Sequence, residues 1–364
     1  MVHVVLAGGG TAGHTSPLIA TAERLRELVP DVDLVVIGTP KGLESRVIPA
    51  AGLRLEQIPP VPLPRSLKPE LFAVPGRLLA SVREARRIIQ NHRADVVVGF
   101  GGYVSLPAYL AARQQRVPIV VHEGNAVPGL ANRIAARFTP HVAVSFPKTP
   151  LRHARYLGLP VRAGIARLDR AAARAAARAQ FDLDPALPTL LVSGGSQGAR
   201  SINLATEIAL PDLLARGVQV LHVLGPKNFA DAPEPQNDPA TGARYRPVAY
   251  VAKMEDAYAA ADLMLGRSGA GTVVETAVVG LPVVFVPLPH GNGEQARNAD
   301  ALVAAGASRL VPDSQLTGAR LLAEVFPLVT DAPALAAMTA AGHDLVPSDA
   351  AGALAHLILD AAGR

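Results

Sequence analysis

Short apolar runs, each followed by a glycine turn and then an Ala- and Leu-rich stretch, recur along this chain of 364 residues. Five runs lie in the first half and four in the second, at residues 3–7, 33–38, 95–100, 118–123, 142–146, 189–194, 218–225, 262–267 and 282–287. Val- and Ile-rich runs of this length that alternate with helical stretches predict buried parallel strands joined by crossover helices. The pattern therefore predicts an α/β protein.

The same opening occurs twice along the chain. HVVLA leads into AGGGTAGH near residue 10, and TLLV leads into SGGSQGAR near residue 196. We therefore predict two Rossmann-like, doubly wound parallel-sheet domains, at residues 1–160 and 161–345, which face a substrate cleft. Residues 158–188 form the predicted linker, and an amphipathic helix within 346–364 is predicted to close the chain.

The amino-acid composition excludes several kinds of site. The chain has no cysteine, which excludes disulfides, thiolate zinc sites and a cysteine nucleophile. No stretch reaches the roughly 18 uninterrupted apolar residues of a membrane span, and the first residues enter a predicted strand without a charged leader. We therefore expect a protein that is neither exported nor membrane-spanning.

Charge is unevenly distributed along the sequence. Residues 1–160 hold 19 Lys and Arg against 10 Asp and Glu, whereas residues 161–364 hold 16 against 20. A basic surface fits nucleic acid, an anionic membrane or a phosphorylated ligand. Nucleic acid is the weakest of these because the basic segments lack interleaved aromatic residues and match no recognition motif.

Residues 65–93 combine apolar side chains with seven Lys and Arg against two Glu. This composition suits a helix that lies on an anionic lipid surface. The residues predicted to contact the membrane are Leu71, Phe72, Leu78, Leu79 and Arg83. An ordinary amphipathic helix with a solvated basic face is the alternative.

The opening glycines, Gly8, Gly10 and Gly13, match the G-x-G-x-x-G pattern of a dinucleotide-binding turn. An NAD site also needs an acidic residue at the end of the second strand, where this chain has glycine, threonine and proline at 38–40. The match to an NAD site is therefore weak. Glycines before a helix also suit a tight turn, or an approach of backbone N–H groups to an anion.

His14 ends this turn. Ser16 and Pro17 supply an N-cap and a favoured first helical residue, so we predict that the helix begins at Ser16, with His14 just outside it. A histidine there would lie at the mouth of the cleft and titrate near neutrality. A solvated or backbone-bonded loop histidine is the alternative.

The second half carries a more specific pattern around residue 270. A predicted strand ends at Gly266, a small-residue turn covers 268–271, and a helix is predicted to open at Thr272 with Glu275 in its first turn. This arrangement suits a diphosphate cradle with a carboxylate for the ribose hydroxyls. A capping box from Thr272 to Glu275 is the alternative, and it can coexist with the ribose role. The polar loop at 290–298 suits a sugar-reading loop or an ordinary surface loop.

Two D-x-D strings raise the possibility of a metal site. Asp31 and Asp33 precede a predicted strand, and Asp182 and Asp184 precede a proline, so all four lie away from the carboxyl ends of the strands. We interpret them as strand-edge and turn residues and predict no metal site.

Taken together, the motifs resemble the MurG family of bacterial peptidoglycan N-acetylglucosaminyltransferases. The stretches that carry the resemblance are GGGTAGHTSP (8–17), GFGGYVSLPA (99–108), HEGNAVPGLANR (122–133), LPVR (159–162), GGSQGAR (194–200), RSGAGTVVET and HGNGEQARNA. The resemblance covers nearly the whole chain. It implies the GT-B fold, with UDP-N-acetylglucosamine held mainly by the C-terminal half and a lipid acceptor by the N-terminal half.

The resemblance also implies a set of donor-binding residues. They are Thr11, Ala12, Gly13, Asn125, Arg162, Ser196, Val251, Ala270, Gly271, Thr272, Val273, Val274, Glu275 and Gln295. Arg162 and Ser196 suit the diphosphate, because arginine offers paired donors and the serine is predicted to lie at a helix start. The backbone of Val251 would meet the uracil edge, and Glu275 would hold the ribose.

The amides of Gln295 and Asn125 are implied to hold the sugar hydroxyls. Three positions depart from the family pattern: Leu159 replaces an asparagine, Gly124 replaces a glutamine, and Glu294 replaces the first of two glutamines. These departures affect the hydrogen bonding expected around the diphosphate and the sugar.

The implied reaction is attack by the 4-hydroxyl of N-acetylmuramic acid in lipid I on the anomeric carbon, with inversion and loss of UDP. His14 is the predicted general base, and the pair at 122–123 is the competitor. We expect no metal and no cofactor, a peripheral location on the cytoplasmic face of the plasma membrane, and contacts with other cell-wall synthesis proteins. A UDP-N-acetylglucosamine 2-epimerase and a non-catalytic nucleotide-sugar-binding protein are the alternatives.

Overall fold

A computed structural model describes residues 1–61, 74–290 and 292–363. It divides the chain into two compact units. The first unit consists of Met1–Arg162 together with the C-terminal segment from Asp349, and the second unit is Ala163–Ser348. The division falls two residues after the predicted boundary at 160. The C-terminal segment, which we expected to form a separate closing helix, belongs to the first unit.

The sheet of the first unit has seven strands in the order β3-β2-β1-β4-β5-β6-β7. Every neighbouring pair is parallel, with Val5 opposite Val35 on one side and Val97 on the other. The strands are β1 (His3–Ala7), β2 (Asp33–Gly38), β3 (Arg54–Gln57), β4 (Val96–Gly99), β5 (Ile119–Glu123), β6 (Val142–Val144) and β7 (Ala154–Tyr156). The strand order reverses between β1 and β4, which makes their carboxyl ends the topological switch point.

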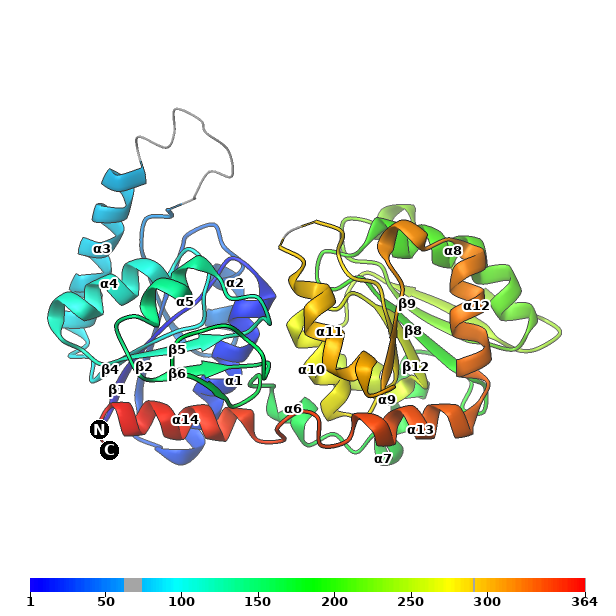
Figure 1. The fold of residues 1–364 in the computed structure, drawn as a ribbon. Helices are drawn as coiled ribbons and strands as arrows, with labels where there is room; N and C mark the ends of the chain where they lie inside the picture. Colours follow the sequence, from blue (N-terminus) through cyan, green and yellow to red (C-terminus); the bar gives the residue numbers. More distant parts are fainter. Residues whose placement is uncertain (62–73, 291, 364) are drawn as a thin grey trace. The chain divides into compact units, whose positions relative to one another are not determined.

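Helices cover both faces of this sheet (Figure 1). They are α1 (Ala12–Leu28), α2 (Glu44–Ala50), α3 (Val74–Asn91), α4 (Ser105–Gln115), α5 (Leu130–Ala135) and α14 (Ala350–Ala361). Alternate residues of β1 enter two cores: Val5 packs with residues of α3 and α4, whereas Val4 and Leu6 pack with residues of α1 and α14. The C-terminal helix α14 lies along α1 and fills one core, for example with Leu354.

The second unit repeats this plan. Its sheet has the order β10-β11-β9-β8-β12-β13-β14, with every pair parallel except β10–β11. The strands are β8 (Thr189–Ser193), β9 (Gln219–Val223), β10 (Gln236–Asn237), β11 (Arg244–Val248), β12 (Leu263–Gly266), β13 (Val283–Phe285) and β14 (Ser308–Leu310). Here the order reverses between β8 and β12, so β8 corresponds to β1 and β12 to β4.

The helices of the second unit include those of the predicted linker. They are α6 (Ala163–Ala166), α7 (Arg170–Gln180), α8 (Arg200–Ala215), α9 (Met254–Ala260), α10 (Ala270–Val278), α11 (Glu294–Ala304), α12 (Gly318–Val329) and α13 (Ala332–Gly342), with 3₁₀ turns η2 (Phe229–Asp231) and η3 (Asp313–Gln315). One sheet face packs against α8, α12 and α13. Helix α7 is anchored by the buried guanidinium of Arg178, which donates to Asp262 at 2.8 Å and to the Ala260 carbonyl at 3.0 Å.

The predicted α/β class and the two doubly wound parallel sheets are confirmed. Within the described residues, no single helix is long and apolar enough to span a bilayer. Helices α12 and α13 reach that length only as a pair bent by 89°, and both contribute buried residues to the core of the second unit.

Candidate functional site

The first glycine turn leads directly into α1. The helix begins at Ala12, not at Ser16 as predicted, so His14 lies in its first turn. Thr11 is extended (φ −139°), and its carbonyl accepts the N–H groups of His14 and Thr15, each at 3.2 Å. These bonds start the helix ahead of Pro17, which lies in its second turn and cannot donate to the carbonyl of Gly13.

The imidazole of His14 lies between two glycine turns at the switch point. Its Nδ1 is 3.0 Å from the Gly9 carbonyl and 3.2 Å from the Thr11 hydroxyl. On its other edge, a Cβ on Gly101 would lie 3.1 Å from Nε2. Gly101 (φ +95°) and Gly102 (φ +80°) are both left-handed, and a Cβ on Gly102 would lie 2.7 Å from the Gly9 carbonyl oxygen. The close fit of the two turns thus requires glycine at both positions.

Burial lowers the pKa of His14 from its ordinary value, while the Glu123 charge, the Gly9 hydrogen bond and the Glu44 charge oppose the shift. The imidazole is therefore neutral at physiological pH. Because Nδ1 faces the Gly9 carbonyl, the tautomer that satisfies this bond carries its proton on Nδ1 and a lone pair on Nε2. A neutral Nε2 of this kind can accept a proton.

The competing pair, His122 and Glu123, has a structural role. His122 is buried, its Nε2 lies 3.2 Å from the Ser145 hydroxyl, and burial lowers its pKa to about 4. The Glu123 carboxylate accepts the backbone N–H groups of Asn125 at 3.0 Å and Gly129 at 2.9 Å. Glu123 therefore shapes the loop after β5.

Two of the three family departures lie side by side in the first unit. A Cβ on Gly124 would lie 3.7 Å from Cδ1 of Leu159 and 3.6 Å from the carbonyl oxygen of Gly13. Leu159 is buried. An apolar side chain at 159 thus fills the space beside the small residue at 124, and Asn125 follows directly in the loop that Glu123 organises.

Glu44 is the residue of this site that the sequence analysis missed. Its buried carboxylate accepts the backbone N–H of Gly10 at 2.8 Å, the backbone N–H of Thr39 at 2.9 Å and the Thr39 hydroxyl at 2.7 Å. Burial alone would raise its pKa, but these hydrogen bonds hold the pKa below its ordinary value. The only sequence signal was a glutamate six residues after β2, beyond the position that the dinucleotide pattern requires.

Arg162 belongs to the first unit rather than to the unit that carries Ser196. It lies near Glu23 of α1: burial raises the pKa of that carboxyl, and the charge of Arg162 opposes the shift. Of the two residues predicted to bind the diphosphate, Arg162 is thus in the first unit and Ser196 in the second.

The second unit has its own glycine turn after β8. Helix α8 begins at Arg200, so Ser196 lies at the exposed tip of the turn. The prediction that Ser196 lies at a helix start is wrong. Gly195 (φ +82°) and Gly198 (φ +73°) are left-handed, and the N–H of Gly195 donates to the Ser193 hydroxyl at 3.2 Å. The turn therefore presents Ser196 to solvent at the switch point of this sheet.

The turn after β12 faces the same switch point. Helix α10 begins at Ala270 with Gly269 as its N-cap, two residues before the predicted start at Thr272. Glu275 therefore lies in the second turn, and the capping-box alternative is wrong. Its carboxylate accepts the Tyr258 hydroxyl at 2.7 Å.

The N-terminus of α10 offers backbone rather than side-chain donors. Ala270, Gly271 and Thr272 hold the first three helical N–H groups, which have no partner within an α-helix. Val273 and Val274 are buried, so their side chains pack in the core of the unit. The N–H of Val273 donates to the Gly269 carbonyl at 3.0 Å, so the predicted contacts of these two valines with the sugar nucleotide stay predictions.

Two further predicted donor-site residues, Val251 and Gln295, lie in the second unit. Val251 is buried and belongs to the segment that connects β11 to α9. Gln295 is in the first turn of α11, where its side-chain oxygen accepts the N–H of Leu288 at 2.9 Å. Glu294, the third departure, accepts the N–H of Asn292 at 2.9 Å and so closes the preceding loop.

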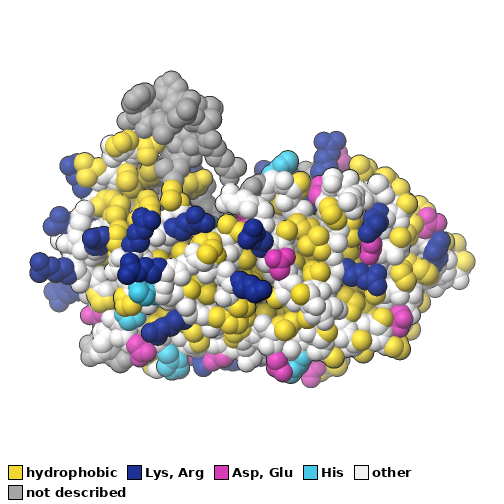
Figure 2. Space-filling view, viewed as in Figure 1, with side chains coloured by type: hydrophobic (Ala, Val, Ile, Leu, Met, Phe, Trp, Pro, Cys, Tyr) yellow, Lys and Arg dark blue, Asp and Glu magenta, His cyan; other side chains and the backbone are white. Residues whose placement is uncertain are grey.

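The predicted membrane segment is only partly described. Leu71 and Phe72 lie outside the described residues. On α3, Leu78 is partly buried and packs against the core of the first unit, and its membrane contact stays a prediction. Leu79 is 49% exposed and Arg83 is exposed. Figure 2 shows many Lys and Arg side chains over this part of the first unit.

The D-x-D residues have local partners, as expected for strand-edge and turn positions. Asp33 lies 3.2 Å from His3, Asp182 pairs with Arg244 at 2.8 Å, and Asp184 caps the N–H of Ala186 at 2.8 Å. Within the described ranges, no three His, Asp or Glu side chains are grouped so that they could hold a metal ion.

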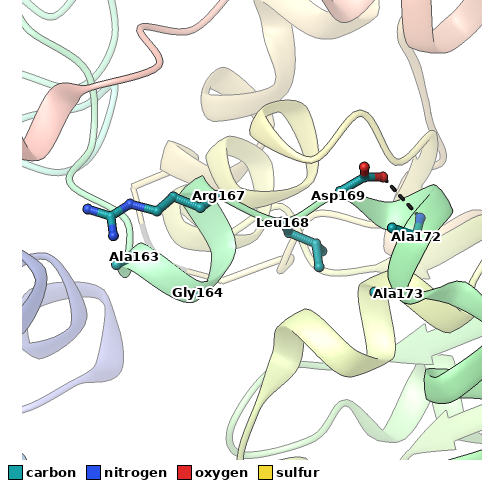
Figure 3. Close-up of a pocket in the computed structure, with 7 residues that line it drawn as sticks. All are labelled: Ala163, Gly164, Arg167, Leu168, Asp169, Ala172 and Ala173. Carbon is teal, nitrogen blue, oxygen red and sulfur yellow. Dashed lines mark hydrogen bonds between the residues drawn. The ribbon is translucent and has the colours of Figure 1, made fainter.

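A hollow between α6 and α7 lies apart from the switch point of the second unit (Figure 3). It is lined by Ala163, Gly164, Arg167, Leu168, Asp169, Ala172 and Ala173. The Asp169 carboxylate is used as the N-cap of α7, where it accepts the N–H of Ala172 at 3.0 Å. This hollow contains no predicted site residue.

Comparisons with known proteins show the family of this chain. Two family models match, the glycosyltransferase family 28 N-terminal domain over residues 4–144 and its C-terminal domain over residues 189–351. A UDP-N-acetylglucosamine--N-acetylmuramyl-(pentapeptide) pyrophosphoryl-undecaprenol N-acetylglucosamine transferase of Cutibacterium acnes is 58% identical, over 100% of this chain and 98% of its own length. The crystal structure of Acinetobacter baumannii MurG is 28% identical, with a TM-score of 0.77, over 99% of this chain and all of that one. The chain belongs to the MurG family.

Other relatives support the same conclusion. A transferase of the same name from Nocardioides is 57% identical over 99% of this chain and 98% of its own. The calicheamicin glycosyltransferase CalG4, 17% identical with a TM-score of 0.67 over 100% and 99% of the two chains, shares the fold. The GT-B fold that the MurG resemblance implied is confirmed, and the protein is a glycosyltransferase of peptidoglycan synthesis.

Proposed function

We propose that this chain transfers N-acetylglucosamine from UDP-N-acetylglucosamine to the 4-hydroxyl of N-acetylmuramic acid in lipid I, forming lipid II with inversion. The activity for which its relatives are named, and their similarity over nearly their full length, support these substrates. The observation that carries the chemistry is the neutral, oriented His14 at the switch point of the first unit.

In the proposed step, the acceptor oxygen attacks the anomeric carbon while its proton passes to Nε2 of His14. The bond from the anomeric carbon to the β-phosphate oxygen breaks, and UDP leaves with the electron pair. The Gly9 carbonyl keeps the imidazole oriented as it becomes an imidazolium. General-base assistance of this kind contributes about 10²–10⁴-fold to a rate.

The second unit supplies most of the donor site in this proposal. The first N–H groups of α10 and the exposed Ser196 suit the diphosphate, and Glu275 suits the ribose hydroxyls. Val251 would meet the uracil. Arg162 adds a bidentate donor for the diphosphate. Because backbone dipoles and a guanidinium can stabilise the leaving UDP, we propose a reaction that needs neither metal nor cofactor.

The sugar and acceptor contacts complete the proposal. Gln295 and Asn125 would hold the sugar hydroxyls. The exposed Leu79 and Arg83 of α3 suit contact with anionic lipid on the cytoplasmic face of the membrane, where the acceptor lies.

The test is incubation of purified protein in EDTA with UDP-N-acetylglucosamine, with and without a short-chain lipid I analogue, followed by mass spectrometry. We expect acceptor-dependent UDP release and a product heavier by one N-acetylhexosamine. UDP release without acceptor, together with free N-acetylmannosamine, would instead indicate an epimerase. Donor binding without turnover would indicate a binding protein. Activity that is absent in EDTA but present in a parallel reaction without EDTA would refute metal independence.

A further inference from the structure

Glu44 is fully buried and ionised, yet the proposed reaction assigns it no role. Its exposed fraction is 0%, and three hydrogen bonds hold its carboxylate, one of them from the N–H of Gly10. A buried carboxylate is costly unless it is well bonded. Because the carboxylate binds the glycine turn just before His14, we ask whether it acts on that turn.

A single peptide unit connects Glu44 to His14. The N–H of Gly10 and the C=O of Gly9 belong to the same amide, and in a trans peptide they point in opposite directions. The N–H donates to Glu44 at 2.8 Å, and the C=O lies 3.0 Å from Nδ1 of His14. The carboxylate, the amide and the imidazole therefore form one hydrogen-bonded chain.

We propose that Glu44 is a positioning residue for His14, acting through the Gly9–Gly10 peptide. This inference rests on the proposed function, in which His14 is the general base. The carboxylate orients and polarises the amide, so that the Gly9 carbonyl is a stronger acceptor for Nδ1–H and Nε2 keeps its lone pair. The same chain stabilises the imidazolium that forms when His14 takes the acceptor proton, as a directly bonded carboxylate does in a hydrolase triad.

The surrounding glycines support this arrangement. A Cβ on Gly9 would lie 2.5 Å from the Glu44 carboxyl group, a Cβ on Gly38 would lie 2.6 Å from its side chain, and a Cβ on Gly42 would overlap the carboxylate. None of the three is left-handed. Glycine at these positions is therefore explained by the space that Glu44 occupies, not by backbone conformation.

Two carboxylates and one further histidine are the titratable groups that act on His14. Glu123 faces it from the end of β5, Glu44 acts through the turn after β1, and His122 interacts with it from within β5. Both carboxylates raise the pKa of His14 against the effect of burial. Removing the charge of Glu44 is thus expected to lower that pKa further.

The test compares Glu44→Gln with Glu27→Gln, a matched change at an exposed glutamate on the same helix as His14. In full-length protein labelled with ¹⁵N-histidine, the His14 signals are assigned by their loss in His14→Gln. We expect wild-type neutral His14 to carry its proton on Nδ1, and Glu44→Gln to lower its pKa and to reduce kcat about 10- to 100-fold. The donor KM and the Glu27→Gln protein should be unchanged.

The outcomes separate this inference from the proposed function. A folded Glu44→Gln protein whose His14 pKa and tautomer equal those of wild type would overturn the positioning role, whatever its activity. A proton on Nε2 of neutral His14 in the wild-type protein would also overturn the positioning role. This measurement needs no variant, so the proposal can be tested even if the Glu44→Gln protein does not fold. If Glu44→Gln lowers the pKa of His14 but the wild-type protein has no transferase activity, the positioning role would be supported and the proposed function refuted.

Discussion

Each unit has a glycine-rich turn at the switch point of its own sheet, and the two turns are bonded differently. In the first unit, the turn after β1 is bonded internally: Gly10 donates to Glu44, and Gly9 accepts from His14. In the second unit, the corresponding turn after β8 is closed by the Ser193 hydroxyl, and its tip at Ser196 is exposed. A carboxylate of the chain itself thus takes a position where a nucleotide fold would bind an anion.

This difference agrees with the separate roles that we propose for the two units. A turn whose amide is already bonded to a carboxylate is suited to hold a side chain, here a histidine, in one orientation. A turn with an exposed tip beside a helix N-terminus is suited to bind an external diphosphate. The first unit is therefore the candidate for chemistry and acceptor binding, and the second for the donor.

The largest expected effect separates these roles directly. Replacing His14 by Ala should lower kcat by about 10²–10⁴-fold, because the general base is lost. UDP binding, measured by calorimetry, should largely survive, since most of the proposed donor contacts lie in the second unit. His343→Ala, at an exposed histidine of that unit, is the control. An unchanged rate would remove His14 from the mechanism.

The donor side is tested at Glu275. Glu275→Gln should raise the KM for UDP-N-acetylglucosamine about 10- to 100-fold, because hydrogen bonds to charged groups contribute roughly 1.5–3 kcal/mol. Tyr258→Phe, which removes only the hydroxyl 2.7 Å from this carboxylate, should have a smaller effect on the same KM. A lower kcat with an unaltered donor KM would contradict the ribose role.

Membrane contact is tested on two adjacent leucines of α3. Leu79→Glu should weaken binding to anionic vesicles about tenfold, through lost apolar contact and added repulsion, without changing the thermal midpoint. Leu78→Glu should lower the midpoint, because Leu78 packs on the core. Vesicle sedimentation and calorimetry distinguish the two, and vesicle binding by Leu79→Glu equal to that of wild type would refute the assignment.

The smallest expected effect concerns the departures from the family pattern. A Cβ on Gly124 meets only ordinary contacts, at 3.6 and 3.7 Å, so Gly124→Ala should change the free energy of unfolding by no more than about 1 kcal/mol. Gly102→Ala should be clearly destabilising, because its φ is +80° and the Gly9 carbonyl oxygen is 2.7 Å from the new Cβ. Equal unfolding midpoints for the two variants would contradict this interpretation of the paired turns.

The sequence predicted the central strands of both sheets, because strands buried on two faces are continuous Val- and Ile-rich runs. Edge strands escaped it: β3 (RLEQ), β7 (ARY) and β14 (SRL) are short and contain exposed polar residues. The start of α8, predicted at Ser196, was placed too early, because this helix begins at Arg200, whereas the starts of α1 and α10 were placed too late. In each case an extended residue after a glycine turn begins the helix, without the side-chain cap that the sequence pattern favours.

The sequence by itself determined the α/β class, the repeated opening and His14 as the candidate base, because periodicity, glycine turns and residue type are local properties. Tertiary structure alone decided that Glu44 bonds to Gly10, that Leu78 packs against the core while Leu79 is exposed, and that the last helix joins the first unit. These facts depend on which distant groups the packed chain brings within hydrogen-bond or van der Waals distance. No local pattern in the sequence specifies such a pairing.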